Sequence, residues 1–349
     1  MSYLAKPKIK IAGVKKNKLG LTLRDYEGGM STLCAGCGHD SITAALVRAF
    51  FELNLPPEKA AKVSGIGCSS KTTAYFLSAS HGINAVHGRM PAIATGANMA
   101  NHSLHYIGIS GDGDSLSIGL GQFAHAIRRN LDMLYIIENN GVYGLTKGQF
   151  SASADVGSTA KRGAVNQLPP LDPVLLALSL GGTFVARGFS GDKDQLIPLI
   201  KAGLSHQGFA LIDIISPCVT FNDHEGSTKS YAHTREHFHE VIHADFVPPS
   251  DEISVEYKDV TPVSLHDGSR IVLRKMSPDY SMKSRNQAWS FIQDHHKKGE
   301  IITGMLFLDD AAADLHTHNN TVEQPLNAIP YEKLCPGEDA LDHLFESLR

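Results

Sequence analysis

Two short motifs, each following a predicted buried strand, constrain the fold of this chain more than any other feature of its sequence. Residues 111–114 read GDGD, and residues 139–140, after a gap spanning 115–138, read NN. The apolar runs at 105–110 and 133–138 are typical of buried strands, and a helical stretch lies between them. A strand–helix–strand unit brings the ends of both strands to the same edge of a parallel sheet. The sequence therefore predicts one site built from both motifs.

The residue types of these motifs suit a divalent metal ion and a diphosphate. Asp112 offers a carboxylate oxygen and Asn140 an amide oxygen, both of which are ligands for Mg²⁺. Gly111 and Gly113 let the backbone approach phosphate oxygens and offer their amides. Either motif alone would usually be a turn that closes a strand, and a nicotinamide site would need the pattern G-x-G-x-x-G, which is absent here. The pairing favours Mg²⁺ as a bridge between the protein and a diphosphate.

The spacing of GDG and NN resembles that of the diphosphate-binding domain of thiamine diphosphate enzymes. This resemblance implies that the carbonyl of Val142 completes the Mg²⁺ shell. It also implies a second domain, which holds the aminopyrimidine end of the cofactor. The chain has the length for only one such domain, so we expect the other on a separate polypeptide and this subunit alone to be inactive.

Four of the five cysteines fall at predicted turns rather than on apolar faces. Cys34 and Cys37 form a Cys-x-x-Cys pair, Cys68 lies in a glycine-bracketed turn, and Cys218 follows a predicted strand. We do not expect disulfides, because no signal peptide is recognised at the N-terminus. Zinc fits by ligand count, and Cys-x-x-Cys alone would fit a redox dithiol. A [4Fe-4S] cluster is favoured because it can carry away electrons released at a neighbouring thiamine diphosphate.

A series of motifs resembles the β subunit of 2-oxoacid:ferredoxin oxidoreductases over roughly residues 25–245. The motifs are LCAGCGH (33–39), GIGCSS (65–70), HGR (87–89), ATGAN (94–98), GDGD (111–114), NNGVYGLTKGQ (139–149) and SPC (216–218). The resemblance implies that Cys34, Cys37, Cys68 and Cys218 hold the cluster, whereas Cys335 lies outside the matched region. The contacts it implies with thiamine diphosphate are Ile66, Gly67, Cys68, Ser69, His87, Gly111, Gly113, Asp114, Gly144 and Leu145.

The resemblance also implies a reaction and its partners. The β subunit would act with an α subunit, or a fused γα subunit, in a dimer of heterodimers. The complex would carry out oxidative decarboxylation of a 2-oxoacid with coenzyme A as co-substrate, and electrons would pass through the [4Fe-4S] cluster to ferredoxin. A more distant alternative is a thiamine diphosphate-dependent decarboxylase or synthase without electron transfer. This alternative would leave four cysteines without a function. A zinc-bound scaffold subunit is the non-catalytic alternative.

Two lysines are candidates for substrate recognition. Lys147 lies where relatives that resemble pyruvate enzymes carry glycine, and it could pair with the second carboxylate of 2-oxoglutarate. Such a charge-assisted contact is worth about 1.5–3 kcal/mol. We therefore predict conversion of 2-oxoglutarate to succinyl-CoA and CO₂, reversible in principle, with pyruvate or indolepyruvate as the alternative substrate. A solvated loop lysine is the alternative for Lys147. Lys71 could offset thiolate charge or steer an acidic substrate.

Composition and charge are those of a soluble α/β protein. The content of 42% apolar residues is enough for a large core. The net charge of −4 does not indicate a basic surface that binds nucleic acid. The longest apolar stretches are too short for a membrane span, so we expect a cytoplasmic protein. Residues 1–24 form a basic arm, and its first twenty positions contain lysines but no acidic residue. We expect this basic arm to lie on a partner chain.

The pattern of elements predicts a mostly parallel sheet with helices on both faces, over residues 25–246. A helix capped by Asp40 and Ser41 should run to about residue 52, and another should run over 117–129. Residues 247–349 form a predicted C-terminal extension, with a helix near 283–298 and a strand at 301–308, which we expect to contact a partner. His233, His237, His239 and His243 are expected on the polar face of one helix rather than around a metal.

Overall fold

The main sheet of the protein runs through the whole body of the molecule. The computed structural model describes residues 13–159, 163–247, 260–264, 270–275, 277, 280–335 and 337–349. Over these ranges, ten strands form the sheet. From edge to edge they are β10 (Val260–Ser264), β11 (Arg270–Lys275), β9 (Phe238–Val247), β12 (Ile301–Leu308), β7 (Phe184–Phe189), β8 (Phe209–Ile215), β4 (Met133–Asn139), β3 (His105–Gly111), β1 (Ala60–Ser64) and β2 (His81–Asn84).

Six neighbouring strands, from β7 to β2, are all parallel. Their central members are apolar at almost every position, and both β4 and β8 are buried along their full length. Strands buried on both faces need such continuous apolar runs. Beyond β7 the direction changes, because β12 pairs with it antiparallel, and β9 then runs parallel to β12. The prediction of a mostly parallel sheet is confirmed.

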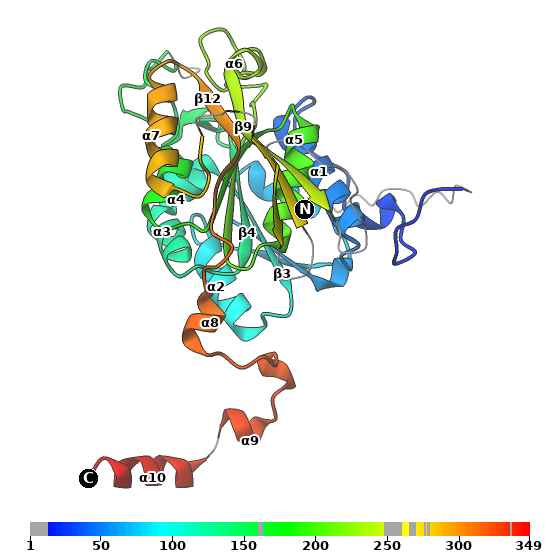
Figure 1. Cartoon of the computed structure of the whole chain (residues 1–349), viewed down its shortest axis with the longest axis vertical. Helices are drawn as coiled ribbons and strands as arrows, with labels where there is room; N and C mark the ends of the chain where they lie inside the picture. The colour runs from blue at the N-terminus through cyan, green and yellow to red at the C-terminus, as the bar shows by residue number, and fades with distance from the viewer. Residues whose placement is uncertain are drawn as a thin grey trace.

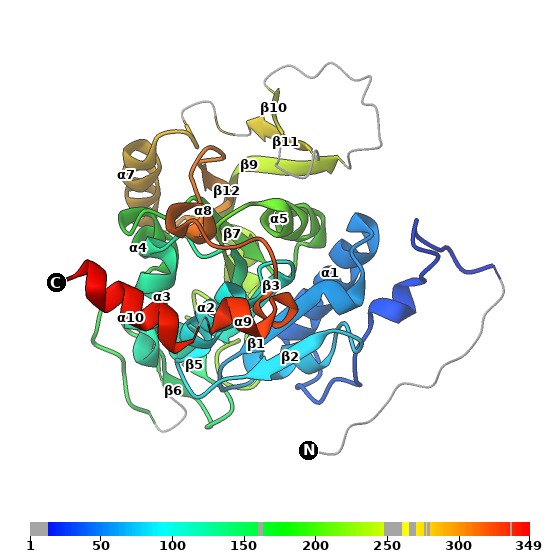
Figure 2. The same cartoon turned by 90° about the horizontal axis from the view of Figure 1, so that it is seen from below.

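Helices cover both faces of this sheet (Figures 1 and 2). The α-helices of the body are α1 (Gly38–Leu53), α2 (Met90–Ala100), α3 (Leu120–Arg128), α4 (Pro173–Ser179), α5 (Lys193–Ser205), α6 (Tyr231–His237) and α7 (Arg285–His296). Helices α1 and α5 pack together on one face. On the other face, α2, α3, α4 and α7 follow one another as a layer. Both faces of the central strands are therefore sealed from water.

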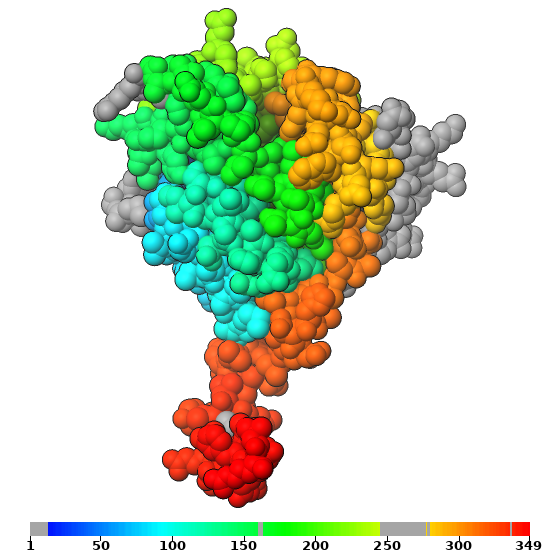
Figure 3. Space-filling view, turned by 90° about the vertical axis from the view of Figure 1, so that its left-hand side faces the viewer, coloured from blue at the N-terminus to red at the C-terminus, as the bar shows by residue number. Residues whose placement is uncertain are grey.

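The predicted C-terminal extension contributes to this same sheet. Strand β12 lies between β9 and β7, and α7 packs against β12 and α4. After β12 the chain passes through α8 (Leu315–Asn319), η5 (Leu326–Ala328) and α9 (Tyr331–Leu334) to α10 (Glu338–Ser347). Helix α8 packs on the body, since Leu315 and His316 are buried, and the part that ends in α9 and α10 projects away as a tail (Figures 1 and 3). Contact of the tail with a partner stays a prediction.

Two predicted helix starts differ from the structure. Helix α1 begins at Gly38, with Cys37 in the N-cap position, rather than after a cap at residues 40 and 41. The earlier start is possible because residue 38 has no side chain, and a Cβ there would stand 2.5 Å from Ser216 Oγ. The helix predicted from residue 117 is preceded by a π-helical turn, Gly113–Ile118, and α3 follows it. Single π turns often occur at functional sites.

Two further expectations concern the ends of the chain and membranes. Residues 1–12 of the basic arm lie outside the described residues, and Lys15, Lys16 and Lys18 precede the first 3₁₀ turn, η1 (Leu23–Tyr26). Within the part of the chain that the structure describes, every helix is too short or too polar to cross a membrane.

Candidate functional site

A small cavity lies where β1, β3 and β4 end. Its volume is about 90 Å³, and its walls come from five segments that are distant in the sequence. The predicted site residues that line it are Ile66, Gly67, Cys68, Ser69, His87, Gly111, Asp112, Gly113, Asp114, Asn140, Val142, Gly144 and Leu145. The structure thus brings the predicted metal, diphosphate and thiamine contacts together with one predicted cluster ligand. His39, Glu138, Tyr143 and Thr146 complete the lining.

Asp112 is buried in the wall of this cavity and is the focus of several hydrogen bonds. The amide of Gly141 donates to Asp112 Oδ2 at 3.0 Å, and the hydroxyls of Ser151 and Ser153 donate to the same oxygen. Among the described residues no cationic side chain forms an ion pair with this carboxylate. A buried carboxylate with oriented donors and no paired cation fits the binding of a divalent metal ion.

The other predicted Mg²⁺ ligands lie beside Asp112. The amide of Val142 donates to Asn140 Oδ1 at 3.0 Å, and the side chain of Asn222 donates to the carbonyl of Asn140 at 2.8 Å. These bonds hold the segment that follows β4 in a fixed position. The sequence did not identify Ser151 and Ser153, which follow β6 (Gln149–Phe150). Only the S-A-S run at 151–153 was available as a signal.

Asp114 joins the loops around the cavity. Its Oδ2 accepts a hydrogen bond from Ser110 Oγ at 2.6 Å, and its Oδ1 accepts one from the amide of Gly88 at 2.7 Å and is paired with Nδ1 of His87. The carboxylate therefore faces protein donors, as expected for a negative group near an anionic diphosphate. We still predict that Asp114 contacts the diphosphate, but through its backbone amide. This amide lies in the first turn of the π helix, where amides bind anions.

Gly113 occupies a position that allows no side chain, whereas Gly144 lies within van der Waals range of two cysteines. A Cβ at Gly113 would stand 2.5 Å from the ring of Tyr143, whose hydroxyl donates to the carbonyl of Gly113 at 3.1 Å. A Cβ at Gly144 would stand 3.4 Å from Cys68 Sγ and 3.6 Å from Cys218 Sγ. Gly144 lies at the turn of the hairpin formed by β5 (Val142–Tyr143) and β6. The hairpin therefore touches both the cofactor cavity and the cysteines.

The four predicted cluster ligands lie around one region of the structure. Cys34 is exposed, Cys37 is buried, and Cys68 and Cys218 are half-buried. Burial raises the pKa of the Cys37 thiol to about 12, and burial is also the main cause that raises the pKa of Cys68 and Cys218. Neighbouring thiols raise these pKa values further through like charge. The thiolates therefore need cations, which the iron of a cluster would supply.

The choice between a cluster and zinc at these cysteines stays a prediction. Among the described residues, no three His, Cys, Asp or Glu side chains form a group that could hold one metal ion. The thiolates of a four-iron cluster each bind a different iron, whereas those of a zinc site share one ion. Cys34, Cys37, Cys68 and Cys218 are the four thiols predicted for either metal.

A buried acid and a buried imidazole meet beneath the cavity. Thr72 Oγ1 donates to both carboxylate oxygens of Glu138, at 3.0 and 3.1 Å. The ring of His39 lies with Nδ1 3.4 Å from Glu138 Oε2 and 2.6 Å from Ser216 Oγ. Burial raises the pKa of Glu138 well above its usual value and lowers the pKa of His39 to about 4. Both shifts favour the neutral form of the group concerned. The sequence did not identify this pair.

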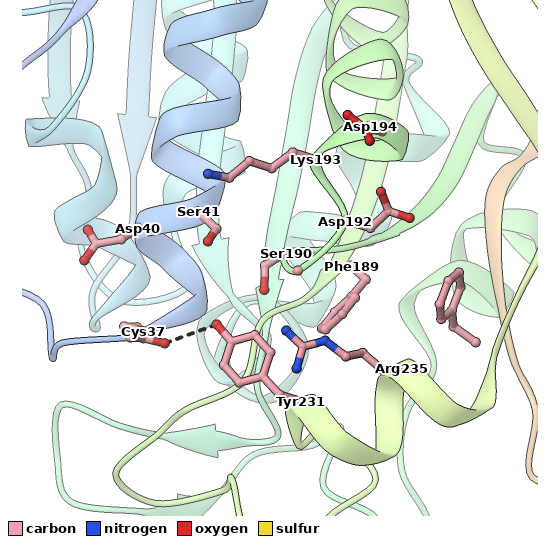
Figure 4. A pocket seen from close by; sticks show the side chains of 13 residues that line it. Cys37, Asp40, Ser41, Phe189, Ser190, Asp192, Lys193, Asp194, Tyr231 and Arg235 are labelled. Carbon is pink, nitrogen blue, oxygen red and sulfur yellow. Dashed lines mark hydrogen bonds between the residues drawn. The ribbon is translucent and has the colours of Figure 1, made fainter.

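A larger cavity, of about 810 Å³, lies beside the Cys-x-x-Cys turn (Figure 4). The hydroxyl of Tyr231, at the start of α6, donates to the carbonyl of Gly36 at 3.1 Å. Gly36 has a φ of +81°, which favours glycine, so this turn can bend tightly between its two cysteines. The guanidinium of Arg235 lies 5.2 Å from the centre of the Tyr231 ring. Helix α6 thus contacts the Cys-x-x-Cys turn through Tyr231.

The predicted substrate lysines lie outside the lining of the cofactor cavity. Lys147 is exposed on the β5–β6 turn, next to the lining residue Thr146, and has a φ of +80°. Lys71 Nζ lies 3.4 Å from Thr32 Oγ1, and its charge lowers the pKa of Cys68 against the larger effect of burial. The structure therefore places Lys147 at the rim of the cavity and Lys71 beside the cysteines.

The histidine group does not occupy one helix face as predicted. His233 and His237 lie on α6, with their rings stacked 3.9 Å apart. His239 and His243 lie on strand β9, because the helix ends at residue 237 and Phe238 is extended. The expectation of a polar face applies only to the first two.

Comparisons with known proteins agree with this geometry. Residues 65–214 match the family described as thiamine pyrophosphate enzyme, C-terminal TPP binding domain. The chain is 38% identical over 272 residues to the 2-oxoacid:ferredoxin oxidoreductase subunit beta of Saccharolobus solfataricus, which covers 71% of this chain and 87% of the relative. It is 40% identical over 291 residues to the subunit of the same name from a Sulfolobus species, which covers 77% and 92%.

Similarity extends to a 2-oxoglutarate-type relative and to a solved structure. The 2-oxoglutarate oxidoreductase subunit KorB of Mycobacterium tuberculosis is 42% identical over 192 residues, which are 54% of this chain and 51% of that protein. The 2-oxoglutarate:ferredoxin oxidoreductase from Magnetococcus marinus, solved with 2-oxoglutarate, coenzyme A and succinyl-CoA bound, superposes with a TM-score of 0.72 at 28% identity. The superposition covers 93% of this chain and 98% of that chain.

Proposed function

The chain belongs to the β subunits of 2-oxoacid:ferredoxin oxidoreductases, and from this premise we propose that it is the β subunit of a 2-oxoglutarate:ferredoxin oxidoreductase. The reaction is the oxidative decarboxylation of 2-oxoglutarate, with coenzyme A taking the succinyl group. Its products would be succinyl-CoA, CO₂, one proton and two electrons, and a [4Fe-4S] cluster would supply the transfer of these electrons to ferredoxin.

The observation that carries the proposal is that one cysteine loop serves both cofactor sites. Ile66, Gly67, Cys68 and Ser69 line the cavity of the predicted thiamine contacts, and Cys68 is also a predicted cluster ligand. Gly144 lies against Cys68 and Cys218 from the cavity side. Electrons released in the cavity would therefore have a short path to the cluster. A thiamine enzyme without electron transfer has no use for this arrangement.

The chain holds each cofactor with its own residues. Asp112, Asn140 and the carbonyl of Val142 would bind Mg²⁺, with Ser151 and Ser153 orienting the carboxylate. Cys34, Cys37, Cys68 and Cys218 would bind the cluster. Thiamine diphosphate supplies the carbanion chemistry that allows CO₂ to leave, and the cluster supplies one-electron transfer. Burial favours the neutral forms of Glu138 and His39, which line the cavity.

The need for a partner is supported by the size and surroundings of the cavity. The cavity is a small space lined by residues of this chain, and a partner surface would complete a site for the whole of thiamine diphosphate. Around the cavity, large apolar side chains are exposed: Ile66 by 39%, Val86 by 76%, Ile118 by 45% and Leu145 by 49%. Apolar groups gathered at the edge of a site mark a protein interface. We propose that an α or fused γα subunit covers this surface, in a dimer of heterodimers.

The choice of 2-oxoglutarate is supported by the relatives and by Lys147. KorB subunits are named for 2-oxoglutarate, and the solved structure was determined with that substrate. Lys147 is exposed and follows the lining residue Thr146, so its ammonium group could pair with the distal carboxylate of the substrate. Pyruvate and indolepyruvate, which lack this carboxylate, are the alternative substrates.

The test is an activity measurement on the anaerobically purified complex with its partner subunit. We expect coenzyme A-dependent reduction of a viologen dye with 2-oxoglutarate, and much slower reduction with pyruvate or indolepyruvate. Iron and acid-labile sulfide should be present at about four of each per chain. A complex that prefers pyruvate would contradict the proposal that 2-oxoglutarate is the substrate. A colourless complex that contains zinc would contradict the proposed reaction.

A further inference from the structure

We propose that the hydroxyl of Thr220 sets the reduction potential of the iron–sulfur cluster by donating a hydrogen bond to the sulfur of Cys34. The inference rests on the proposed function, because it requires that the four cysteines hold a cluster. It goes beyond that function, because it assigns a tuning role to a residue that binds neither metal nor substrate.

The contact joins two separate cysteine loops. Thr220 lies two residues after Cys218, and its Oγ1 donates to Cys34 Sγ at 3.4 Å. This is an ordinary hydrogen-bond length for a sulfur acceptor. Cys34 is exposed, whereas the other three cysteines are buried or half-buried. Thr220 therefore supplies a fixed donor to the sulfur that otherwise faces water.

The loop that carries Thr220 is firmly anchored. The carbonyl of Cys218 accepts hydrogen bonds from the amides of Phe221 at 3.2 Å and Asn222 at 2.9 Å. The side chain of Asn222 then donates to the carbonyl of Asn140, in the predicted Mg²⁺ site. Because its neighbours are held, the backbone keeps the exposed Thr220 side chain within reach of the sulfur.

The chemical difference between this donor and the others is that it belongs to a side chain. Cys37 accepts from the backbone amide of His39, and Cys218 accepts from backbone amides of the loop that follows it. Those amides remain whichever side chains are present. Replacing Thr220 removes one donor without altering the backbone, so its contribution can be isolated.

The direction of the effect follows from charge. A cluster gains one negative charge when it accepts an electron, and hydrogen bonds to its sulfurs stabilise that added charge. The Thr220 hydroxyl therefore favours the reduced cluster and raises its reduction potential. Without the hydroxyl, the ratio of reduced to oxidised cluster at a fixed solution potential should fall about tenfold. For a one-electron couple this is a shift of about 59 mV.

The experiment compares the wild-type complex with Thr220→Val, Thr220→Ser and Thr43→Val. Each anaerobic complex is titrated with dithionite in the presence of redox mediators, and the reduced cluster is followed by electron paramagnetic resonance. Thr220→Val keeps the shape of the side chain and should lower the potential. Thr220→Ser keeps the hydroxyl and should stay near the wild type. Thr43→Val removes a hydroxyl that bonds the carbonyl of His39 rather than a sulfur, so the potential should not change.

The possible results distinguish failure of the role proposed for Thr220 from failure of the proposed function. Equal potentials in the wild type and Thr220→Val, or equal lowering in Thr220→Val and Thr220→Ser, would overturn the role of Thr220 while leaving the proposed function intact. A wild-type complex without iron and sulfide would overturn both. Should Thr220→Val not retain its cluster, Thr220→Ala removes the same donor with a smaller side chain, and a lowered potential there supports the inference. An unchanged potential in Thr220→Ala contradicts it.

Discussion

Gly65 and Asp114 are in contact across the edge of the sheet, such that a Cβ at Gly65 would stand 1.8 Å from Asp114 Oδ2. The carboxylate is held there by Ser110 and Gly88. The loop that carries Cys68 and the loop that carries His87 are thus packed against one buried carboxylate.

We predict that Gly65→Ala weakens the binding of thiamine diphosphate in the presence of Mg²⁺. The added methyl group must displace Asp114, and overpacking of this kind costs about 1–3 kcal/mol. Titration calorimetry of the complex measures the effect. Gly82→Ala is the matched control, since a Cβ at that position of β2 meets no atom within 4 Å. Equal affinities in Gly65→Ala and the wild type would show that Asp114 does not position the site.

We predict that Ser153→Ala raises the concentration of Mg²⁺ needed for cofactor binding by about 10- to 100-fold, the usual effect of losing a hydrogen bond that orients a metal ligand. The hydroxyl of Ser153 donates to Asp112 Oδ2 and lies 2.9 Å from Asn139 Oδ1. Mg²⁺ titration at a fixed concentration of thiamine diphosphate gives this value. Ser103→Ala, in the turn before β3, serves as the control. An unchanged Mg²⁺ requirement would contradict the assigned role.

We predict that Lys147→Gln lowers kcat/KM for 2-oxoglutarate by about 10- to 100-fold and leaves pyruvate turnover unchanged, because a charge-assisted contact with the distal carboxylate is lost. Lys147→Arg should retain the preference. Glycine is a poorer test, because residue 147 has a φ of +80° and glycine would also relieve backbone strain. Parallel losses for both substrates in Lys147→Gln would indicate a structural role instead.

We predict that Cys218→Ser removes the brown colour of the complex and that Cys335→Ser does not. Cys218 lies near Cys68 and Gly144, whereas Cys335 is exposed at the end of α9 in the tail. Iron content and visible absorption after anaerobic purification give the answer. Loss of iron in Cys335→Ser would contradict the predicted set of four ligands.

We predict that Lys62 makes the free energy of unfolding rise with pH above about 8. Burial lowers the pKa of its ammonium group from 10.5 to about 8. Between these values the unfolded chain binds a proton that the folded chain does not, so stability increases as pH rises. The full difference is about 3 kcal/mol at 1.36 kcal/mol per pKa unit. Comparison of urea unfolding from pH 7.5 to 10 with the variant Lys62→Met isolates this contribution.

That prediction has a specific alternative. Lys62 Nζ donates to the carbonyls of Thr73 at 2.7 Å and Leu77 at 2.9 Å, and these bonds favour the charged form. If they outweigh desolvation, the wild type and Lys62→Met will show the same slope of stability against pH between 8 and 10.

The sequence predicted the elements that depend on local patterns. The strand at Ile301–Leu308 was placed with the bounds that the structure has, and β3 and β4 were predicted one residue short. Continuous apolar runs identify buried strands whatever their neighbours are. The sequence predicted a boundary at residue 247 because the composition changes there. In the structure, the later strand β12 lies within the main sheet beside β7. Strand order is set by long-range packing, which a local pattern does not contain.

The amino-acid sequence by itself determined the chemistry available to this protein: four cysteines at turns, an acid and an amide at two neighbouring strand ends, and glycines where ligands approach. Residue type and spacing are enough for that, because a parallel unit brings its strand ends together. Only the tertiary structure decided which groups surround them: Ser151 and Ser153 on Asp112, the buried Glu138–His39 pair, and Thr220 on Cys34. Each of these contacts joins segments far apart in the chain. They arise from the packing of loops against one sheet edge, where burial and hydrogen bonding, rather than residue spacing, fix the partners.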